Sequence, residues 1–123
     1  YIMRLSETYL LRAEAYFHKG DLANAANDIN VVRGRAQAKP VQPGQISLDY
    51  ILDERMRELV VEEPRRKTLV RLNKLYERTM KYNFRVKDNM EPYHELWPIP
   101  QTAIDANTGA KLLQNPGYPG AAE

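Results

Sequence analysis

The clearest hydrophobic pattern in the chain lies in residues 47–63. Apolar side chains recur there at close to the 3.6-residue period of an α-helix, at Leu48, Ile51, Leu52, Met56, Leu59 and Val60. Ser47 can cap the free N–H groups at the start of such a helix, and Asp49 suits the positive end of its dipole. The pattern therefore predicts an amphipathic helix that begins after Ser47 and ends at Glu63, directly before Pro64.

The first 36 residues have the pattern of a helical hairpin. Residues 2–18 are apolar on nearly all sides, which predicts a helix packed on more than one face, with a stripe formed by Leu5, Tyr9, Ala13 and Tyr16. Gly20 can end this helix in the left-handed conformation, and Asp21 can cap a second helix over residues 22–36. Because the connection is short, we expect the two helices to run antiparallel.

This hairpin partly matches the tetratricopeptide repeat. Small and large residues fall at the spacing of that repeat, at Ala13, Tyr16, Gly20, Asp21, Ala25 and Ile29. No second copy follows at about the 34-residue period of this class. A single hairpin leaves one apolar face uncovered, so we expect the central helices or residues outside this sequence to cover it.

The second half of the chain contains more proline. Pro64 suits the first turn of a further helix over residues 64–82, with a stripe formed by Leu69, Leu72, Tyr76 and Met80. Beyond Asn83, five prolines exclude long regular elements, although residues 101–107 can form one short helical turn. We expect the apolar residues of this tail to form a cluster that lies across the helices as a strap; they are Tyr93, Leu96, Trp97, Ile99 and Ile104.

Together these patterns predict an all-α fold in a single domain over residues 1–123. A tetratricopeptide-like helical hairpin occupies residues 1–36, and a loop with two prolines and a glycine follows. A central helix pair then occupies residues 47–82, and an irregular, Pro-rich C-terminal strap occupies residues 83–123.

The central helix carries an unusual set of charges. Arg55 and Glu62 fall inside its apolar arc, and Glu58 falls at the edge. Two interpretations compete: a pair of carboxylates placed for acid–base chemistry, or a structural ion network that joins this helix to its neighbours. No nucleophile, histidine or set of metal ligands accompanies the carboxylates, which favours the network. We assign to it Glu54, Arg55, Glu58, Glu62 and Arg65.

An unpaired guanidinium inside the apolar arc would be costly. We therefore expect Arg55 to be buried and paired with Glu58 or Glu62, or with backbone carbonyls of the tail. Elsewhere, Glu14 and His18 lie four residues apart on one helical face, which is half of a metal site at most. The sequence indicates no catalytic residue, metal site or cofactor.

Composition and charge exclude some classes of function. The fractions of hydrophobic residues, 43%, and of charged residues, 28%, are typical of a globular chain. A net charge of +2 is too balanced to indicate nucleic-acid binding. The sequence has no cysteine and no apolar run that approaches the ~18 residues of a membrane span. It also begins at Tyr1 within a helical pattern, so we expect a fragment of a longer protein, with any targeting segment outside it.

Nearly the whole chain resembles the C-terminal region of SusD/RagB-like proteins, through the successive segments RLSETYLLRAEAYFHKGDLANAANDINVVRGRA, ISLDYILDERMREL, YHELWPIPQTAIDAN and QNPGY. The DER-x-REL element, residues 53–59, and LWPIP, residues 96–100, make the resemblance specific. Many members have Arg-Trp-Phe-Asp-Leu where this sequence has Arg-Arg-Lys-Thr-Leu at residues 65–69, which suggests a distinct subfamily.

The resemblance implies a surface lipoprotein of a Gram-negative outer membrane, built on tetratricopeptide-like helices. Such proteins are not enzymes. They capture nutrients, often oligosaccharides, and deliver them to a TonB-dependent transporter of the SusC type. The implied partners are this transporter, a glycan ligand and the remainder of the parent chain. The implied contact with the membrane is a lipid anchor outside this sequence.

The resemblance supplies no ligand site. Trp97 is the candidate for sugar stacking, because an aromatic face can pair with the apolar face of a pyranose. Its position inside LWPIP favours a packed structural anchor instead. An alternative function is a tetratricopeptide-like scaffold that docks a protein segment in a helical groove. Such a scaffold does not need a strap of this length, so the tail favours nutrient capture.

Overall fold

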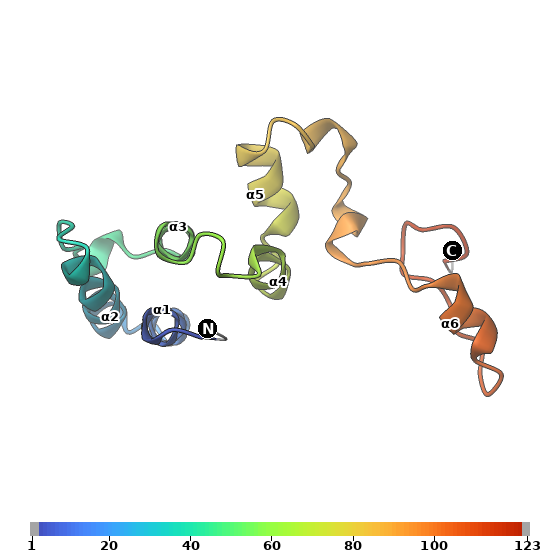
Figure 1. Cartoon of the computed structure of the whole chain (residues 1–123), viewed down its shortest axis with the longest axis horizontal. Helices are drawn as coiled ribbons and strands as arrows, with labels where there is room; N and C mark the ends of the chain where they lie inside the picture. The colour runs from blue at the N-terminus through green and yellow to red at the C-terminus, as the bar shows by residue number, and fades with distance from the viewer. Residues whose placement is uncertain (1–2, 122–123) are drawn as a thin grey trace. The chain divides into compact units, whose positions relative to one another are not determined.

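Helices make up the regular structure of residues 3–121, which are the residues that the computed structural model describes (Figure 1). Within this range the only β-type pairing is an isolated bridge between Gln114 and Ala121. The predicted all-α fold is therefore confirmed. The chain divides after Pro64 into two compact units, and each is described by itself.

The first unit contains the hairpin and the central helix. Helix α1 spans Leu5–His18, α2 spans Leu22–Arg35 and α3 spans Leu48–Glu58. The predicted caps are present: the Asp21 side chain accepts a hydrogen bond from the Asn24 backbone N–H at 3.1 Å, and Ser47 Oγ accepts one from Tyr50 at 3.1 Å. Gly20 is left-handed, with φ of 77°, which only glycine adopts without strain. The antiparallel hairpin is confirmed.

Helices α1, α2 and α3 share one hydrophobic core with the loop between α2 and α3. Alanines at the α1–α2 contact let the two helices approach closely, and the loop is fastened by the Asn30 side chain, which donates to and accepts from the backbone of Val41 at 3.0 and 2.7 Å. The buried members are Leu10, Ala13, Ala25, Ala26, Ile29, Val32, Val41, Ile46, Ile51 and Leu59. Fully burying each larger side chain contributes roughly 1.5–3 kcal/mol.

Helix α3 is shorter than the sequence predicts. It ends at Glu58 rather than Glu63, and the carbonyl of Leu59 accepts hydrogen bonds from the N–H groups of Glu62 and Glu63 in the following turn. Val61 takes a left-handed φ of 70° in this turn. The chain reverses there, and the reversal brings Glu63 back to α3.

The second unit contains α4 (Arg65–Arg71), α5 (Leu75–Tyr82), two short 3-10 helices (Lys87–Asn89 and Pro92–Glu95) and α6 (Gln101–Ala106). The predicted single helix over residues 64–82 is wrong. Asn73 adopts a left-handed φ of 52°, and the N–H of Lys74 donates to the carbonyl of Leu69 at 2.8 Å, as in a Schellman ending. The predicted helical turn near residues 101–107 is confirmed as α6.

The boundary between the two units falls between α3 and α4, inside the central helix pair that the sequence suggests. Within the second unit, the start of the tail is fastened to α4 and α5. Arg66 Nη2 donates to the carbonyl of His94 at 2.8 Å, and the backbone N–H of Tyr76 donates to the Glu95 carboxylate at 3.0 Å. A single domain over residues 1–123 stays a prediction.

Candidate functional site

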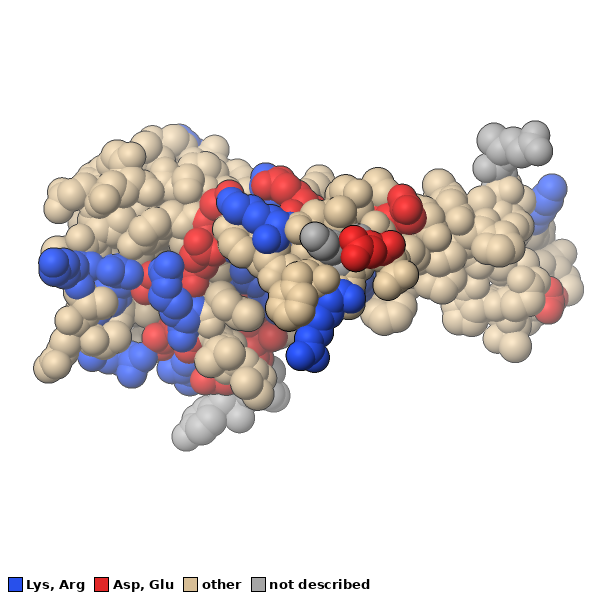
Figure 2. Space-filling view, turned by 90° about the horizontal axis from the view of Figure 1, so that it is seen from above, with Lys and Arg blue, Asp and Glu red and all other residues tan. Residues whose placement is uncertain are grey.

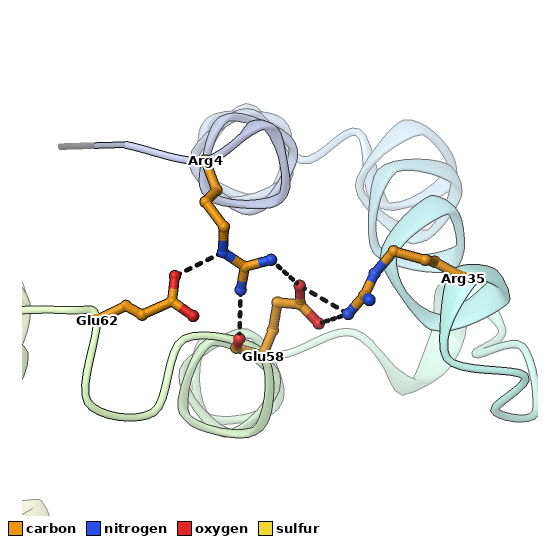
Figure 3. Close-up of polar contacts among 4 residues, drawn as sticks. All are labelled: Arg4, Arg35, Glu58 and Glu62. Carbon is orange, nitrogen blue, oxygen red and sulfur yellow. Dashed lines mark hydrogen bonds and ion pairs between the residues drawn. The ribbon is translucent and has the colours of Figure 1, made fainter. Parts of the chain in front are cut away.

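The carboxylate of Glu58 lies between two arginines from different helices (Figure 3). Arg35, at the end of α2, donates to both carboxylate oxygens at 3.0 and 2.8 Å. Arg4, at the start of α1, lies 3.1 Å from one of these oxygens and also donates to the Glu58 backbone carbonyl at 2.8 Å and to Glu62. These four residues therefore join the start of α1, the end of α2 and the end of α3.

The environment of Glu58 favours its charged form. Burial by itself would raise the pKa of the Glu58 carboxyl, but the hydrogen bonds and positive charge of Arg35, together with the charge of Arg4, outweigh burial and leave that pKa below its ordinary value. A carboxylate whose pKa falls on folding stabilises the folded state above its unfolded pKa, and this stabilisation is lost as pH falls through the folded pKa.

We therefore expect the first unit to lose stability in acid partly through Glu58. In Glu58→Gln, the unfolding midpoint should depend less steeply on pH than in the unsubstituted chain below about pH 4.3, the ordinary pKa of glutamate. Thermal melts followed by circular dichroism from neutral pH to pH 2 measure this. Glu77→Gln is the control, because the Glu77 side chain is 53% exposed and pairs with Lys74 at the surface. Identical pH profiles for Glu58→Gln and the unsubstituted chain would refute the assignment.

Arg55 is buried, as the sequence predicts, and is 1% exposed. Its Nε donates to Glu63 at 2.7 Å, and its Nη2 lies 3.4 Å from Glu7. The predicted partners Glu58 and Glu62 are wrong, because these carboxylates pair with Arg4 and Arg35 instead. The turn after α3 explains the difference, since it folds Glu63 back onto the guanidinium.

Glu54 is a second carboxylate of α3 that pairs with another helix of the unit. It accepts hydrogen bonds from Arg33 at 2.8 Å and from Arg57 at 2.7 Å, and it is nearly buried. A general acid needs a carboxyl whose charged form is disfavoured, whereas Glu54 and Glu58 each accept from guanidinium groups. The geometry thus supports a structural ion network over acid–base chemistry.

Sequence reasoning missed more than half of this network. Its unpredicted members are Arg4, Glu7, Arg33, Arg35, Arg57 and Glu63. Arg33 and Arg35 are recognisable as cations in the last turn of a helix, but Arg33 meets a carboxylate 21 residues further along the chain. Arg65 begins α4 in the second unit, and its place in the network stays a prediction.

The other polar candidates gain no support as metal sites. Glu14 is buried, whereas His18 is exposed with its ring against Phe17. Over residues 3–121, no three carboxylate, imidazole or thiol groups come together as metal ligands.

Within the same range, no helix is both long and apolar enough to cross a membrane.

Trp97 is not the buried anchor that the sequence suggests. Its side chain is 71% exposed, and Leu96 beside it is 47% exposed, so the prediction that these two members of the tail cluster are buried is wrong. One side of the indole is covered by the guanidinium of Arg66, whose central carbon lies 4.5 Å from the ring centroid. The guanidinium thus packs against one side of the indole, and the rest of the Trp97 side chain is exposed.

Side chains from the end of the chain hold the backbone around Trp97. Gln114 exchanges two hydrogen bonds with the backbone of Ile99, at 2.7 and 2.8 Å. Asn115 donates to the carbonyl of Trp97 at 2.7 Å, and the Tyr118 hydroxyl donates to the carbonyl of Leu96 at 2.9 Å. The backbone of residues 96–99 is therefore held in place by these three side chains, which we call the tail clamp.

An apolar hollow lies on the first unit between the start of α1 and the end of α2. Its volume is about 450 Å³, and it is lined by Met3, Leu5, Tyr9 and Val31 with Arg4 and Arg35 among the polar lining residues. Met3, Leu5 and Val31 are at least half exposed. The hairpin thus retains the uncovered apolar face that its sequence predicts.

Comparison with known proteins identifies relatives over most of the chain. Starch-binding protein SusD from Bacteroides thetaiotaomicron is 36% identical over 124 aligned residues, which cover 95% of this chain and 21% of that protein. SusD-like protein P25 from Formosa agariphila is 35% identical over 115 aligned residues, which cover 86% of this chain and 22% of that protein. The search of solved structures gave no significant match.

The chain therefore spans about a fifth of the length of the curated relatives that it matches. The model of the SusD family matches residues 1–118, which include the hairpin, the ion network and the clamped tail. The chain belongs to the SusD family.

Proposed function

We propose that this chain is part of a protein that captures carbohydrate at the bacterial outer-membrane surface. The observation that carries the proposal is the family match over residues 1–118, together with a relative that is named for starch binding. The ligand class we propose is an oligosaccharide. The role we propose is binding without catalysis, because the paired carboxylates of α3 are suited to holding helices together.

The proposal includes delivery of the ligand to a transporter of the SusC type, as the family resemblance implies. The structure of the first unit is suited to a supporting role in such a protein. Its three helices are joined by charged side chains from the C-terminal half of α3 and the turn that follows it, so they form a rigid support on which binding loops can be presented.

A second candidate function is the docking of a protein segment on the hairpin. The apolar hollow between α1 and α2, with arginines beside it, favours this candidate. A segment with an apolar anchor and a neighbouring carboxylate would suit that surface. Binding of such a peptide in the absence of any glycan affinity would favour this function over carbohydrate capture.

A glycan array followed by isothermal titration calorimetry tests the main proposal. The full-length protein that contains this chain should bind at least one oligosaccharide class, and it should release the glycan unmodified, as chromatography of the recovered ligand can show. The 123-residue chain alone serves as the comparison and locates the site inside or outside it. A full-length protein that binds no glycan, or that cleaves the bound glycan, would contradict the proposal.

A further inference from the structure

Leu96 and Trp97 form an exposed apolar pair on a backbone that is already held in place. We call this pair the Leu96–Trp97 ridge. The tail clamp fixes the backbone of residues 96–99, and Arg66 packs against one side of the indole. A side chain that is fixed before binding loses little conformational entropy when it binds, so a ridge of this kind is suited to docking.

Most polar side chains around the ridge already make hydrogen bonds to the backbone. Gln114, Asn115 and Tyr118 each spend hydrogen bonds on the backbone of residues 96–99, and Arg66 donates to the carbonyls of His94 and Glu95. A sugar site needs polar groups beside the aromatic ring that are available to hydroxyls. The surroundings of Trp97 therefore favour an apolar partner over a carbohydrate.

The tail around the ridge also carries few charges. From residue 92 onward the charged side chains are Glu95, Asp105, Lys111 and Glu123. On the face of the molecule in Figure 2, the C-terminal part at the right is mostly uncharged, whereas positive and negative side chains are mixed over the first unit at the left. Depletion of charge is the compositional mark of the core of an interface.

The second unit buries little apolar surface of its own. Among the residues of this unit whose burial is described, Thr68, Leu69, Leu75 and Arg78 are buried, and two of these four are hydrophobic. Several of its large apolar side chains are more than half exposed, namely Tyr82, Phe84 and Trp97. A unit of about 60 residues with so small a core needs further contacts to be stable.

We propose that the Leu96–Trp97 ridge docks into an apolar pocket on the part of a full-length SusD-family polypeptide that this chain does not span. The aligned chain accounts for 21–22% of its relatives, so roughly four-fifths of their length is available to supply that pocket. The occupant is thus a protein surface that offers an apolar cavity and an acceptor for the indole N–H.

Cysteine accessibility tests this proposal. The 123-residue chain has no cysteine, so Leu96→Cys places a single thiol on the ridge, and Lys111→Cys places one at an exposed position of the same unit. Alkylation rates of the two thiols are measured in the 123-residue chain and in the full-length protein, with mass spectrometry of the peptide to locate the label. The ratio of the two rates corrects for general reactivity.

In the 123-residue chain we expect both thiols to react at similar rates. In the full-length protein, the alkylation rate of the Leu96→Cys thiol should fall to about one tenth, or less, of its rate in the 123-residue chain, the ratio that about 1.4 kcal/mol of docking gives. The alkylation rate of the Lys111→Cys thiol should not fall. Equal rates at the two positions in the full-length protein would overturn the proposal. Protection that already exists in the 123-residue chain, or that appears only when oligosaccharide is added, would also overturn it.

A second measurement covers the case in which the cysteine itself weakens docking. Trp97→Ala should leave the melting of the 123-residue chain nearly unchanged, because the indole there is mostly exposed. In the full-length protein the same change should lower the melting temperature, and Trp97→Phe should restore part of the loss. Equal melting shifts in the two contexts would contradict docking.

Discussion

Replacement of Arg55 by alanine should lower the free energy of unfolding of the first unit by about 3–5 kcal/mol, the cost of removing one partner of a buried ion pair. Arg55 is 1% exposed and is paired with Glu63, whose side chain is 2% exposed. Without the guanidinium, the carboxylate of Glu63 stays buried and loses the positive partner that Arg55 supplies. Chemical denaturation followed by circular dichroism measures the change.

Arg57→Ala is the matched control on the same helix. Arg57 also pairs with a glutamate, Glu54, but its side chain is 58% exposed, and Arg33 remains bonded to Glu54 when Arg57 is removed. An exposed pair of this kind contributes roughly 0–1 kcal/mol. If Arg55→Ala and Arg57→Ala destabilise the chain equally, the buried pair does not hold the first unit together.

Replacement of Gly117 by alanine should open the tail clamp. Gly117 has a left-handed φ of 87°, and a Cβ at this position would lie 2.3 Å from Cγ of Tyr93. The left-handed conformation alone costs a non-glycine residue about 1–3 kcal/mol, which corresponds to roughly 5–150-fold more frequent opening. The clash with the Tyr93 ring adds to this cost, because the ring packs edge-on against Tyr118, whose hydroxyl holds Leu96.

Limited proteolysis of the 123-residue chain measures the opening, since the cleavage rate within residues 96–118 follows the population of the open tail. Gly109→Ala is the control, because a Cβ at Gly109 meets no atom within 4 Å and no left-handed φ occurs there. Gly109→Ala should be cleaved like the unsubstituted chain. Equal cleavage of Gly117→Ala and Gly109→Ala would mean that Gly117 does not hold the tail in its clamped form.

The sequence was sufficient for the elements that depend on local signals. The hairpin follows from a glycine that can adopt positive φ, an aspartate cap and two apolar stripes, all within the first 36 residues. The break between α4 and α5 was not predicted, because Asn73 marks it without glycine or proline. Asparagine tolerates the left-handed conformation better than most residues, and it is the one local signal for this break.

The ion network shows which features local sequence patterns can predict and which they cannot. Helical periodicity places Arg55 inside the apolar arc of α3 and so predicts its burial correctly. Its partner depends on the left-handed turn at Val61, where a β-branched residue gives no sign of positive φ. Arg4 and Arg35 come to Glu58 only because three helices pack together, which periodicity within one helix cannot reveal.

Trp97 shows the same limit of local sequence patterns, because its predicted burial is wrong. Tryptophan is buried in most folds, and its place in an apolar motif makes burial the natural expectation. Burial depends on what lies against the ring, and in this chain Arg66 covers one side only. The hydrogen bonds of the tail clamp join residues 15–22 positions apart, so neither the clamp nor the exposed ridge has a local signature.

Native-state hydrogen exchange of the 123-residue chain tests the central claim most directly, which is that α1, α2 and α3 form one cooperative body held by the network around Arg55. We predict that amides of these three helices share similar protection, and that Arg55→Ala reduces it in all three together by roughly two to four orders of magnitude. Unchanged protection in Arg55→Ala, or an α3 that exchanges independently of α1 and α2, would contradict the claim.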